Sequence, residues 1–353
     1  MWNEFETGRY KARKKNDIPR LLLTGAGGFV GSHTLIHLLH NTDWHIVITD
    51  SFKHQGKIDR INEVLKSYPE FKERVTLIVH DLVVPFSKQT INKMGKIDYI
   101  ISMASESHVD RSITDPRPFV ENNVSLILTL LEYAREYPVE KFLQVSTDEV
   151  YGPADPGYAH KEGEPHRPSN PYSASKAAQE NICYSYWRTY DMPIIISNTM
   201  NIIGEMQDPE KLVPRAIQAV INDETLPIFG DKDGNVNSTR IYLHARNQAD
   251  ALLYLLKNVT PASFLNGEEI SQYNVVGNKE LTNLEMAQLV AKFANKELKY
   301  EIVDSYSVRP GHDPRYALDG SKIAELGWVA PLSFEDSLKS TVEWTIENKE
   351  WIL

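Results

Sequence analysis

Two adjacent acids and a Tyr-Lys pair are the residues of this chain whose types and spacing could carry out chemistry. The run 145–152 reads Val-Ser-Thr-Asp-Glu-Val-Tyr-Gly, and Tyr172 and Lys176 follow about 20 residues later. A carboxylic acid, a carboxylate and a phenol that can lose its proton are able to divide three proton transfers among them. The combination therefore indicates an elimination reaction coupled to hydride transfer. The alternative for Asp148 and Glu149 is a pair of solvated loop acids.

A glycine-rich turn near the start of the chain indicates a dinucleotide site. The apolar run 20–24 stops at a turn with Gly25, Gly28 and Gly31, and residues 32–40 then show a helical pattern. Glycines at these positions allow a tight turn and a close approach of a pyrophosphate to the backbone. The helix N-terminus then faces the phosphates.

An acid at the end of the second predicted strand indicates which dinucleotide is bound. Residues 45–49 form that strand, and Asp50 follows it about 20 residues past the glycines. A carboxylate there can accept hydrogen bonds from the adenosine ribose and repels a 2′-phosphate. NAD is therefore favoured over NADP.

Strand and helix patterns alternate along the first half of the chain. Further strand signals at 75–79, 99–102 and 142–145 are each followed by a polar turn and a helical stretch. This order predicts an α/β fold, a doubly wound parallel sheet of Rossmann type. Ligands of such sheets lie outside the carboxyl ends of the strands. The residues at these ends that we expect beside the cofactor are Asp81, Leu82 and Ala104. A helix cap is the alternative for Asp81.

The Tyr-x-x-x-Lys spacing carries little information by itself, because it occurs at three other places in this chain. Tyr172 differs in position, since it follows a proline and opens the helical stretch 173–190. Residues four apart share a helix face, so we expect Lys176 beside Tyr172. An ammonium group and a charged nicotinamide would lower the pKa of the phenol and make a base available near neutral pH. The alternative is a buried tyrosine with a surface lysine.

Composition excludes several other classes. The chain has 353 residues and a formal net charge of −10, which disfavours a nucleic-acid binder. No apolar run approaches the ~20 residues of a membrane span. The single cysteine, Cys183, lies in a helical pattern and has no nearby Cys or His run, so we expect a core residue rather than a catalytic thiol, and no metal site. A cytoplasmic location is the resulting prediction.

Several motifs together give the chain a resemblance to a known family. They include the glycine turn, Glu-Ser-His-Val-Asp-Arg-Ser-Ile at 106–113, Thr-Asp-Glu at 147–149, Pro-Glu-Lys-Leu at 209–212 and Arg-Pro-Gly-His-Asp at 309–313. With these motifs the chain resembles the extended short-chain dehydrogenase/reductases, and within them the nucleotide-sugar 4,6-dehydratases that act on dTDP-glucose. Related epimerases, decarboxylases and the GDP-mannose dehydratases share the turn and the Tyr-Lys pair, whereas the Asp-Glu doublet after Thr147 resembles that of the glucose-nucleotide dehydratases. Asp148 is the discriminating residue, because an epimerase has no departing hydroxyl to protonate.

The resemblance implies a mechanism and a retained NAD. Tyr172 would take the proton of the sugar 4-hydroxyl while C4 delivers hydride to NAD, with Thr147 and Lys176 assisting. Glu149 would then remove the C5 proton and Asp148 would protonate the departing 6-hydroxyl, after which hydride returns to C6. The product would be a 4-keto-6-deoxy sugar. A 4-epimerase or decarboxylase, and a non-catalytic NAD-binding scaffold, are the alternatives.

The resemblance also implies which residues bind each ligand. The expected cofactor residues are Gly25, Gly28, Phe29, Val30, Gly31, Asp50, Asp81, Leu82, Ala104, Tyr172, Lys176 and Asn198. The expected residues around the nucleotide sugar are Ser107, Asn201, Lys211, Leu212, Arg240, Arg309 and His312. Each arginine could instead be a surface ion-pair partner. The family usually has Asn-Asn-Tyr-Gly-Pro where this chain reads Asn-Ile-Ile-Gly-Glu at 201–205, which places Glu205 near the expected diphosphate.

A domain organisation and a dimer are implied as well. We expect an N-terminal extension at 1–18, an NAD-binding domain at 19–197 with returning segments at about 237–276, and a nucleotide-sugar lobe at 198–353. The helical stretches 118–137 and 173–190 correspond to the pair through which the family forms a homodimer by a four-helix bundle.

Overall fold

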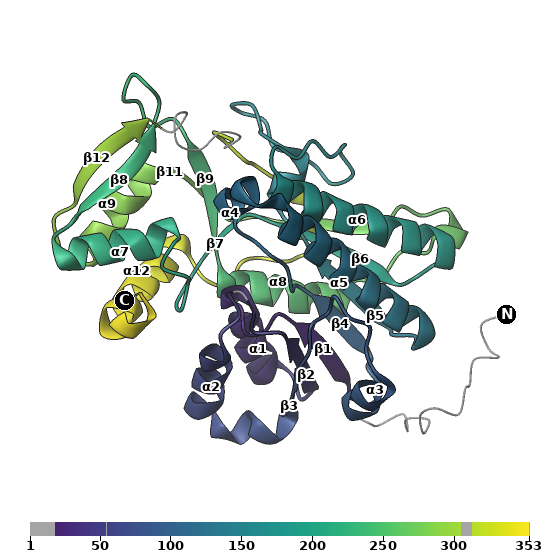
Figure 1. Ribbon diagram of the computed structural model, residues 1–353. Helices are drawn as coiled ribbons and strands as arrows, with labels where there is room; N and C mark the ends of the chain where they lie inside the picture. The colour runs from purple at the N-terminus through teal and green to yellow at the C-terminus, as the bar shows by residue number, and fades with distance from the viewer. Residues whose placement is uncertain (1–17, 54, 305–312, 353) are drawn as a thin grey trace.

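The computed structural model describes residues 18–53, 55–304 and 313–352 (Figure 1). The expected N-terminal extension, apart from Ile18, and the expected site residues Arg309 and His312 lie outside this part of the chain. Among the described helices, none has the length and apolar character needed to cross a membrane.

A seven-stranded parallel sheet forms the larger lobe, as the alternating pattern predicted. Its order is β10-β6-β5-β4-β1-β2-β3, and every neighbouring pair is parallel. The strands are β1 (Arg20–Thr24), β2 (His45–Asp50), β3 (Val75–Val79), β4 (Tyr99–Ser102), β5 (Lys141–Val145), β6 (Ile194–Thr199) and β10 (Ser271–Val275).

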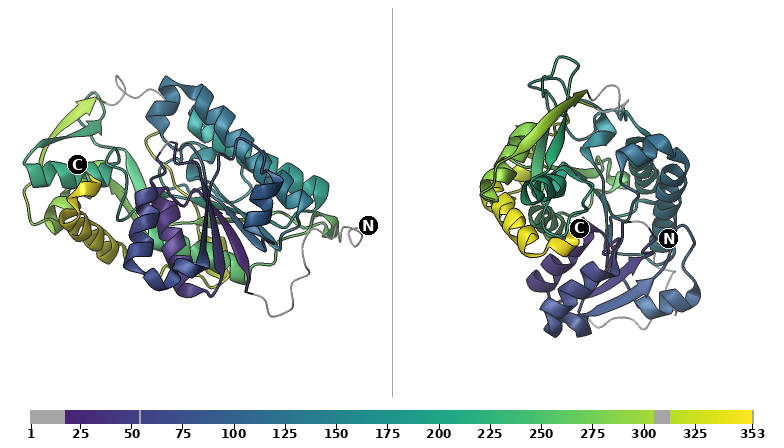
Figure 2. Two further views of the ribbon diagram at one scale, coloured as in Figure 1. Left: turned by 60° about the horizontal axis from the view of Figure 1, so that its bottom comes forward. Right: turned by 60° about the vertical axis from the view of Figure 1, so that its left-hand side comes forward.

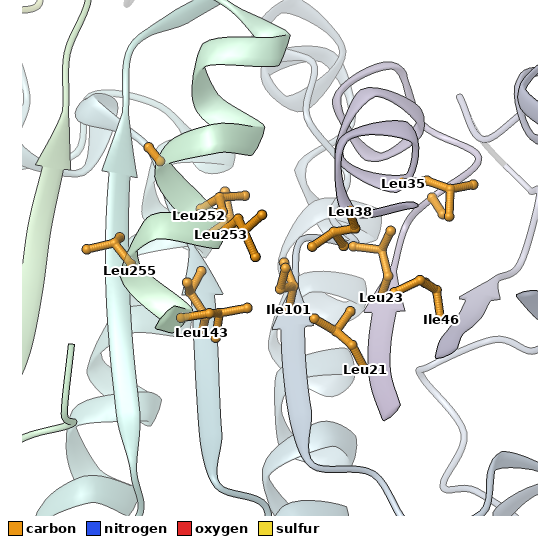
Figure 3. Close-up of a cluster of buried hydrophobic side chains, with 14 of the residues drawn as sticks. Leu21, Leu23, Leu35, Leu38, Ile46, Ile101, Leu143, Leu252, Leu253 and Leu255 are labelled. Carbon is orange, nitrogen blue, oxygen red and sulfur yellow. The ribbon is translucent and has the colours of Figure 1, made fainter. Parts of the chain in front are cut away.

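Alternate residues of each central strand pack on opposite faces of this sheet. Leu21 and Leu23 of β1 join one apolar cluster, whereas Leu22 joins the other. The first cluster includes side chains of α1 (Phe29–Asn41), α2 (Ile58–Ser67) and α8 (Ala245–Asn258), as Figure 3 shows for α1 and α8. The second includes side chains of α3 (Lys88–Met94), α5 (Pro116–Glu136) and α6 (Pro171–Tyr190). Cys183 lies in the second cluster and is fully buried, which confirms it as a core residue.

The smaller lobe has a core of its own, beside the large sheet (Figures 1 and 2). A three-stranded sheet has the order β11-β9-β7, and β12 pairs with β8. These strands are β7 (Asn201–Ile203), β8 (Thr225–Gly230), β9 (Thr239–His244), β11 (Lys279–Thr282) and β12 (Lys299–Asp304). The helices of this lobe are α7 (Leu212–Asn222), α9 (Asn283–Phe293) and α12 (Phe334–Glu347). Between β9 and β11, helix α8 and strand β10 return to the large sheet.

Short elements complete the described chain, and capping residues explain where α6 begins. Asn170 and Ser173 form a reciprocal capping box, and Pro171 occupies the first turn, so the helix begins two residues before the predicted start. The remaining helices are α4 (Val109–Thr114) and α11 (Ser321–Glu325), with 3₁₀ turns η1 (Pro69–Arg74), η2 (Asp148–Tyr151), η3 (Phe264–Asn266) and η4 (Lys349–Trp351).

Candidate active site

A cavity of about 560 Å³ lies between the carboxyl ends of the large sheet and the smaller lobe. Most of the predicted site residues meet in it. Those that line it are Gly25, Gly28, Phe29, Val30, Gly31, Asp50, Asp81, Leu82, Ala104, Ser107, Thr147, Asp148, Glu149, Tyr172, Lys176, Asn201, Lys211, Leu212 and Arg240. The crevice predicted from strand ends and the family motifs of the second half therefore form one site.

The glycine turn fits a dinucleotide. Gly25 has a φ of +73°, which a residue with a side chain rarely adopts, and a Cβ on Gly31 would stand 2.0 Å from the carbonyl oxygen of Gly25. Helix α1 follows directly. Gly28 is its N-cap residue, and no side chain makes a capping hydrogen bond to its first turn. Backbone N–H groups at this end can therefore receive a pyrophosphate.

Two acids stand at the ends of neighbouring strands beside this turn. Asp50 accepts hydrogen bonds from the backbone N–H groups of Gly27 and Phe52, each at 2.9 Å, which fixes its carboxylate in the cavity. Asp81 forms an ion pair of 2.5 Å with Lys53, and this contact lowers the pKa of Asp81. The alternative that Asp81 caps a helix is wrong, because Ser87 is the N-cap of α3.

The acid doublet is not a pair of solvated loop acids, because Asp148 is buried and Glu149 is half-buried. Asp148 is 3% exposed, and the Thr147 hydroxyl donates to its Oδ1 at 2.9 Å. Burial and the neighbouring Glu149 carboxylate raise the pKa of Asp148 to about 7. Burial also raises the pKa of Glu149, but Asn170 donates to that carboxylate at 3.3 Å and opposes the rise. Asp148 is therefore the acid that keeps its proton while Glu149 ionises.

Tyr172 opens helix α6 and reaches the same cavity. Burial and the carboxylates of Glu149 and Asp148 raise the pKa of Tyr172, with the Thr147 hydroxyl acting in the opposite direction. The sequence argument predicted a lower pKa for the phenol with a charged nicotinamide bound, and it did not include these two carboxylates. Positive charge from a bound nicotinamide would oppose the two carboxylates.

Lys176 is buried, which excludes the alternative of a surface lysine. Its Nζ donates to the Val145 carbonyl at 2.8 Å and to Gln179 Oε1 at 2.6 Å. Burial lowers the pKa of Lys176 to about 8. The four-residue spacing correctly placed Lys176 on the helix face of Tyr172. It did not identify the two acceptors, which are the Val145 carbonyl of β5 and Gln179 of α6.

Asn198 does not line the cavity, contrary to the cofactor role expected for it. Its side chain is fully buried and donates to the Thr147 carbonyl at 3.2 Å and to Glu180 Oε1 at 2.7 Å. Gln272 donates to its Oδ1 at 2.9 Å. Asn198 therefore supports the strand end that carries the acids.

Cations from the smaller lobe face the cavity. Lys211 is the N-cap residue of α7, and Leu212 begins that helix. Arg240 is 7% exposed, and its guanidinium donates to the carbonyls of Asp313 and Pro314, each at 2.8 Å, so the alternative of a surface ion pair is wrong for it. Arg215 also lines the cavity and was missed. It lies one helical turn beyond Lys211, and that i, i+4 spacing was the signal that could have found it.

Glu205 is the clearest correction to the sequence analysis. It was expected near the diphosphate, yet it does not line the cavity and is 4% exposed. Its carboxylate pairs with Arg246 and lies 3.2 Å from His244 Nε2. Burial opposes its ionisation, but the side chains of His244, His33 and Arg246 hold the pKa of Glu205 well below its usual range. The acid is therefore neutralised within the protein and places no free charge beside a substrate phosphate.

Comparison with known proteins places the chain in a family. Residues 22–341 match the family described as GDP-mannose 4,6 dehydratase. The low-salt glycan biosynthesis protein Agl12 of Haloferax volcanii is 36% identical over 94% of this chain and 99% of its own length. A dTDP-glucose 4,6-dehydratase of Shigella flexneri is 33% identical, over 94% of each chain.

Solved structures agree with these sequence matches. DesIV, a dTDP-glucose 4,6-dehydratase of Streptomyces venezuelae crystallised with NAD and TYD, superimposes with a TM-score of 0.81 at 32% identity, over 94% of this chain and 98% of that one. A UDP-glucose 4-epimerase of Thermus thermophilus with NAD gives 0.79 at 26% identity, over 92% and 98%. The chain therefore belongs to the GDP-mannose 4,6-dehydratase family of nucleotide-sugar enzymes, within the NAD-dependent extended short-chain dehydrogenase/reductases.

Proposed function

We propose that the protein is a nucleotide-sugar 4,6-dehydratase that converts an NDP-glucose, with dTDP-glucose as its first candidate, to the NDP-4-keto-6-deoxy sugar. The observation that carries this proposal is the pair of acids beside Tyr172 in one cavity, with the pKa of buried Asp148 raised to about 7. An epimerase needs a base for the 4-hydroxyl but no second acid for a leaving group. The doublet therefore favours elimination.

Each acid and base has one task in this proposal. Tyr172 takes the proton of the sugar 4-hydroxyl. The Thr147 hydroxyl is near enough to form a hydrogen bond with the Tyr172 phenol. Glu149 removes the C5 proton once C4 is a ketone, because the carbonyl makes that proton acidic. Asp148 donates its proton to the departing 6-hydroxyl, and water leaves. Bound NAD supplies the oxidation at C4 and the reduction at C6, without net consumption.

The cations of the smaller lobe suit the nucleotide. Lys211, Arg215 and Arg240 of the smaller lobe line the cavity, and a net charge of −10 makes such local cations necessary for a diphosphate. We infer that Lys211 and Leu212 lie beside the base and that Asn201 and Ser107 contact the sugar and diphosphate.

Mass spectrometry after incubation with dTDP-, UDP-, CDP- and GDP-sugars tests the proposed function. We expect loss of water from one NDP-glucose without accumulation of reduced cofactor. Isomerisation at unchanged mass would replace the proposal by an epimerase. Absence of turnover with every donor, together with intact NAD binding, would favour a non-catalytic scaffold.

The dehydration rate should depend on pH through Asp148. Burial raises the pKa of Asp148 to about 7, and only its protonated form can donate to the leaving hydroxyl. The rate should therefore fall as pH rises through about 7, by about tenfold for each further unit, and it should fall again at lower pH, where the Glu149 base takes up a proton. A pH profile of the elimination step measures this effect. A rate that stays constant to two units above that pKa would contradict it.

We propose a homodimer through α5 and α6, which lie side by side on one face of the sheet (Figure 1). Their outer surface carries apolar side chains that are largely exposed: Val120 at 43%, Leu128 at 39% and Tyr184 at 42%. Substitution Leu128→Asp should shift the protein to a monomer, because a charge buried in an apolar interface has no partner. Sedimentation velocity measures the change.

A matched control for this substitution is Val79→Asp. Val79 ends β3 and is 68% exposed, away from α5 and α6. It should leave the sedimentation coefficient unchanged. A Leu128→Asp protein that sediments like the wild type would argue against this interface.

A cytoplasmic location stays a prediction from the sequence.

A further inference from the structure

Arg60 is a buried arginine that lies between the cofactor turn and the segment leading to the substrate-side cations. It belongs to α2 in the larger lobe, and its exposed fraction is 0%. Each of its three guanidinium nitrogens donates a hydrogen bond within the protein. Complete burial of a charged guanidinium lowers the stability of the fold unless hydrogen-bond partners such as these compensate for the lost water.

One side of this guanidinium holds the cofactor turn. Arg60 Nη1 donates to the carbonyl of Gly27, within the glycine turn, at 3.1 Å. It also donates at 2.7 Å to the carbonyl of Gln55, which lines the cavity beside Asp50. A shift of this backbone on NAD binding would therefore move the acceptors of Arg60.

The other side holds the segment that leads to α7. Arg60 Nη2 donates to Asp208 Oδ1 at 2.8 Å, and Nε and Nη2 donate to the Met206 carbonyl at 3.2 and 2.9 Å. Met206 has a φ of +62°, a conformation that residues other than glycine seldom adopt. Arg60 therefore stabilises a backbone that would otherwise relax.

Asp208 in turn positions the backbone of Lys211. Its carbonyl accepts the backbone N–H of Lys211 at 3.1 Å, and both residues line the cavity. A second tie lies nearby, because His108 Nε2 is 3.3 Å from Glu210 Oε2. Side chains of the larger lobe therefore hold residues 206–210, immediately before Lys211 and Leu212, which we assign to the nucleobase.

We propose that Arg60 is a positioning residue that couples occupancy of the NAD site to affinity for the nucleotide part of the substrate. When the glycine turn and the loop at Gln55 are ordered, the guanidinium holds Met206 and Asp208 in the orientation that places Lys211 in the cavity. The inference rests on the proposed function only in taking a nucleoside diphosphate as the ligand of the smaller lobe. It adds a reciprocal effect of each ligand on the other.

Calorimetric titration of the full chain with NAD and with dTDP, each alone and with the other saturating, tests the coupling. Saturating NAD should lower the Kd of wild-type protein for dTDP by about fivefold or more, and dTDP should lower that for NAD by the same factor. In Arg60→Met, which keeps an unbranched side chain, the factor should fall below about twofold. Arg60→Lys keeps the charge but lacks the planar guanidinium whose separate nitrogens donate to the two segments, and it should also lose most of the coupling.

Arg74→Met is the matched control. Arg74 is another arginine of the larger lobe whose guanidinium donates to backbone carbonyls, those of Leu39, Thr42 and Trp44, away from the cavity. It should keep the wild-type coupling factor even if stability falls. Asp208→Ala, which leaves the contacts with Gly27 and Gln55 in place, should lose coupling and serves if Arg60→Met does not fold.

Two results would overturn the role of Arg60. One is wild-type protein that binds NAD and dTDP independently. The other is an Arg60→Met or Asp208→Ala protein in which both affinities weaken and the coupling factor persists, since that pattern marks a purely structural residue. Failure of wild-type protein to bind either ligand would instead contradict the proposed function, so the two failures are distinguishable.

Discussion

Substitution Asp148→Asn is expected to abolish water loss while leaving oxidation at C4 intact. The amide has nearly the same shape but cannot act as an acid toward the departing 6-hydroxyl. Loss of a positioned general acid costs about 100- to 10,000-fold in rate. The structural basis is the burial of this side chain at 3% exposure, with its pKa raised to about 7, so that the wild-type group holds a proton where it is needed.

Exchange at C5 separates this effect from a general loss of activity. In deuterated water the Asp148→Asn protein should still return starting sugar labelled at C5, because Tyr172 and Glu149 remain. Asp59→Asn, at an exposed acid of α2, is the matched control and should keep full turnover. A dehydration rate within about tenfold of wild type would show that another group protonates the hydroxyl.

The sheet and the cofactor end of the site could be predicted because local rules decide them. Strands of β1 to β5 were recognisable from short apolar runs, since both faces of a parallel sheet are covered by helices. The turn between Gly25 and Gly31 depends on close backbone approach, which the glycines themselves disclose. Parallel topology then brings the ends of distant strands to one edge, so Asp50 and Asp81 could be placed from sequence.

Side-chain direction could not be predicted in the same way. Asn198 and Glu205 lie near the site in sequence, yet both point into buried polar networks. The partners of Glu205 are His244 and Arg246, about 40 residues away, and no local pattern links them. Arg60 had no motif at all, because its importance comes only from the two segments that it joins.

The electrostatics of Tyr172 show why a spacing rule gives a group but not its ionisation. The Tyr-x-x-x-Lys pattern put Lys176 on the correct face, but the ammonium group is held by Val145 and Gln179. Burial, and then the acids that the sequence also identified, raise the pKa of the phenol. The net pKa of the phenol therefore depends on distances in the fold and on the charge of the bound nicotinamide, which a spacing rule does not give.

Substitution Tyr172→Phe is expected to stop the reaction before any bond at C5 changes. Phenylalanine keeps the ring but has no oxygen to take the proton of the 4-hydroxyl, so oxidation should slow by about 100- to 10,000-fold. Without a C4 ketone the C5 proton is not acidic, and Glu149 has nothing to remove. Deuterium should therefore not enter recovered sugar, in contrast to the Asp148→Asn protein.

Tyr68→Phe provides a control with the same local sequence pattern. Tyr68 also precedes a lysine by four residues, but its ring packs against His40 and Phe71 at the end of α2. Turnover and exchange should both be retained in it. If Tyr172→Phe still exchanged deuterium at C5, another group would have to accept the 4-hydroxyl proton. Glu149 would be the carboxylate to test next, by Glu149→Gln in the Tyr172→Phe background with reduction of bound NAD as the readout, because Glu149 is also the proposed base at C5.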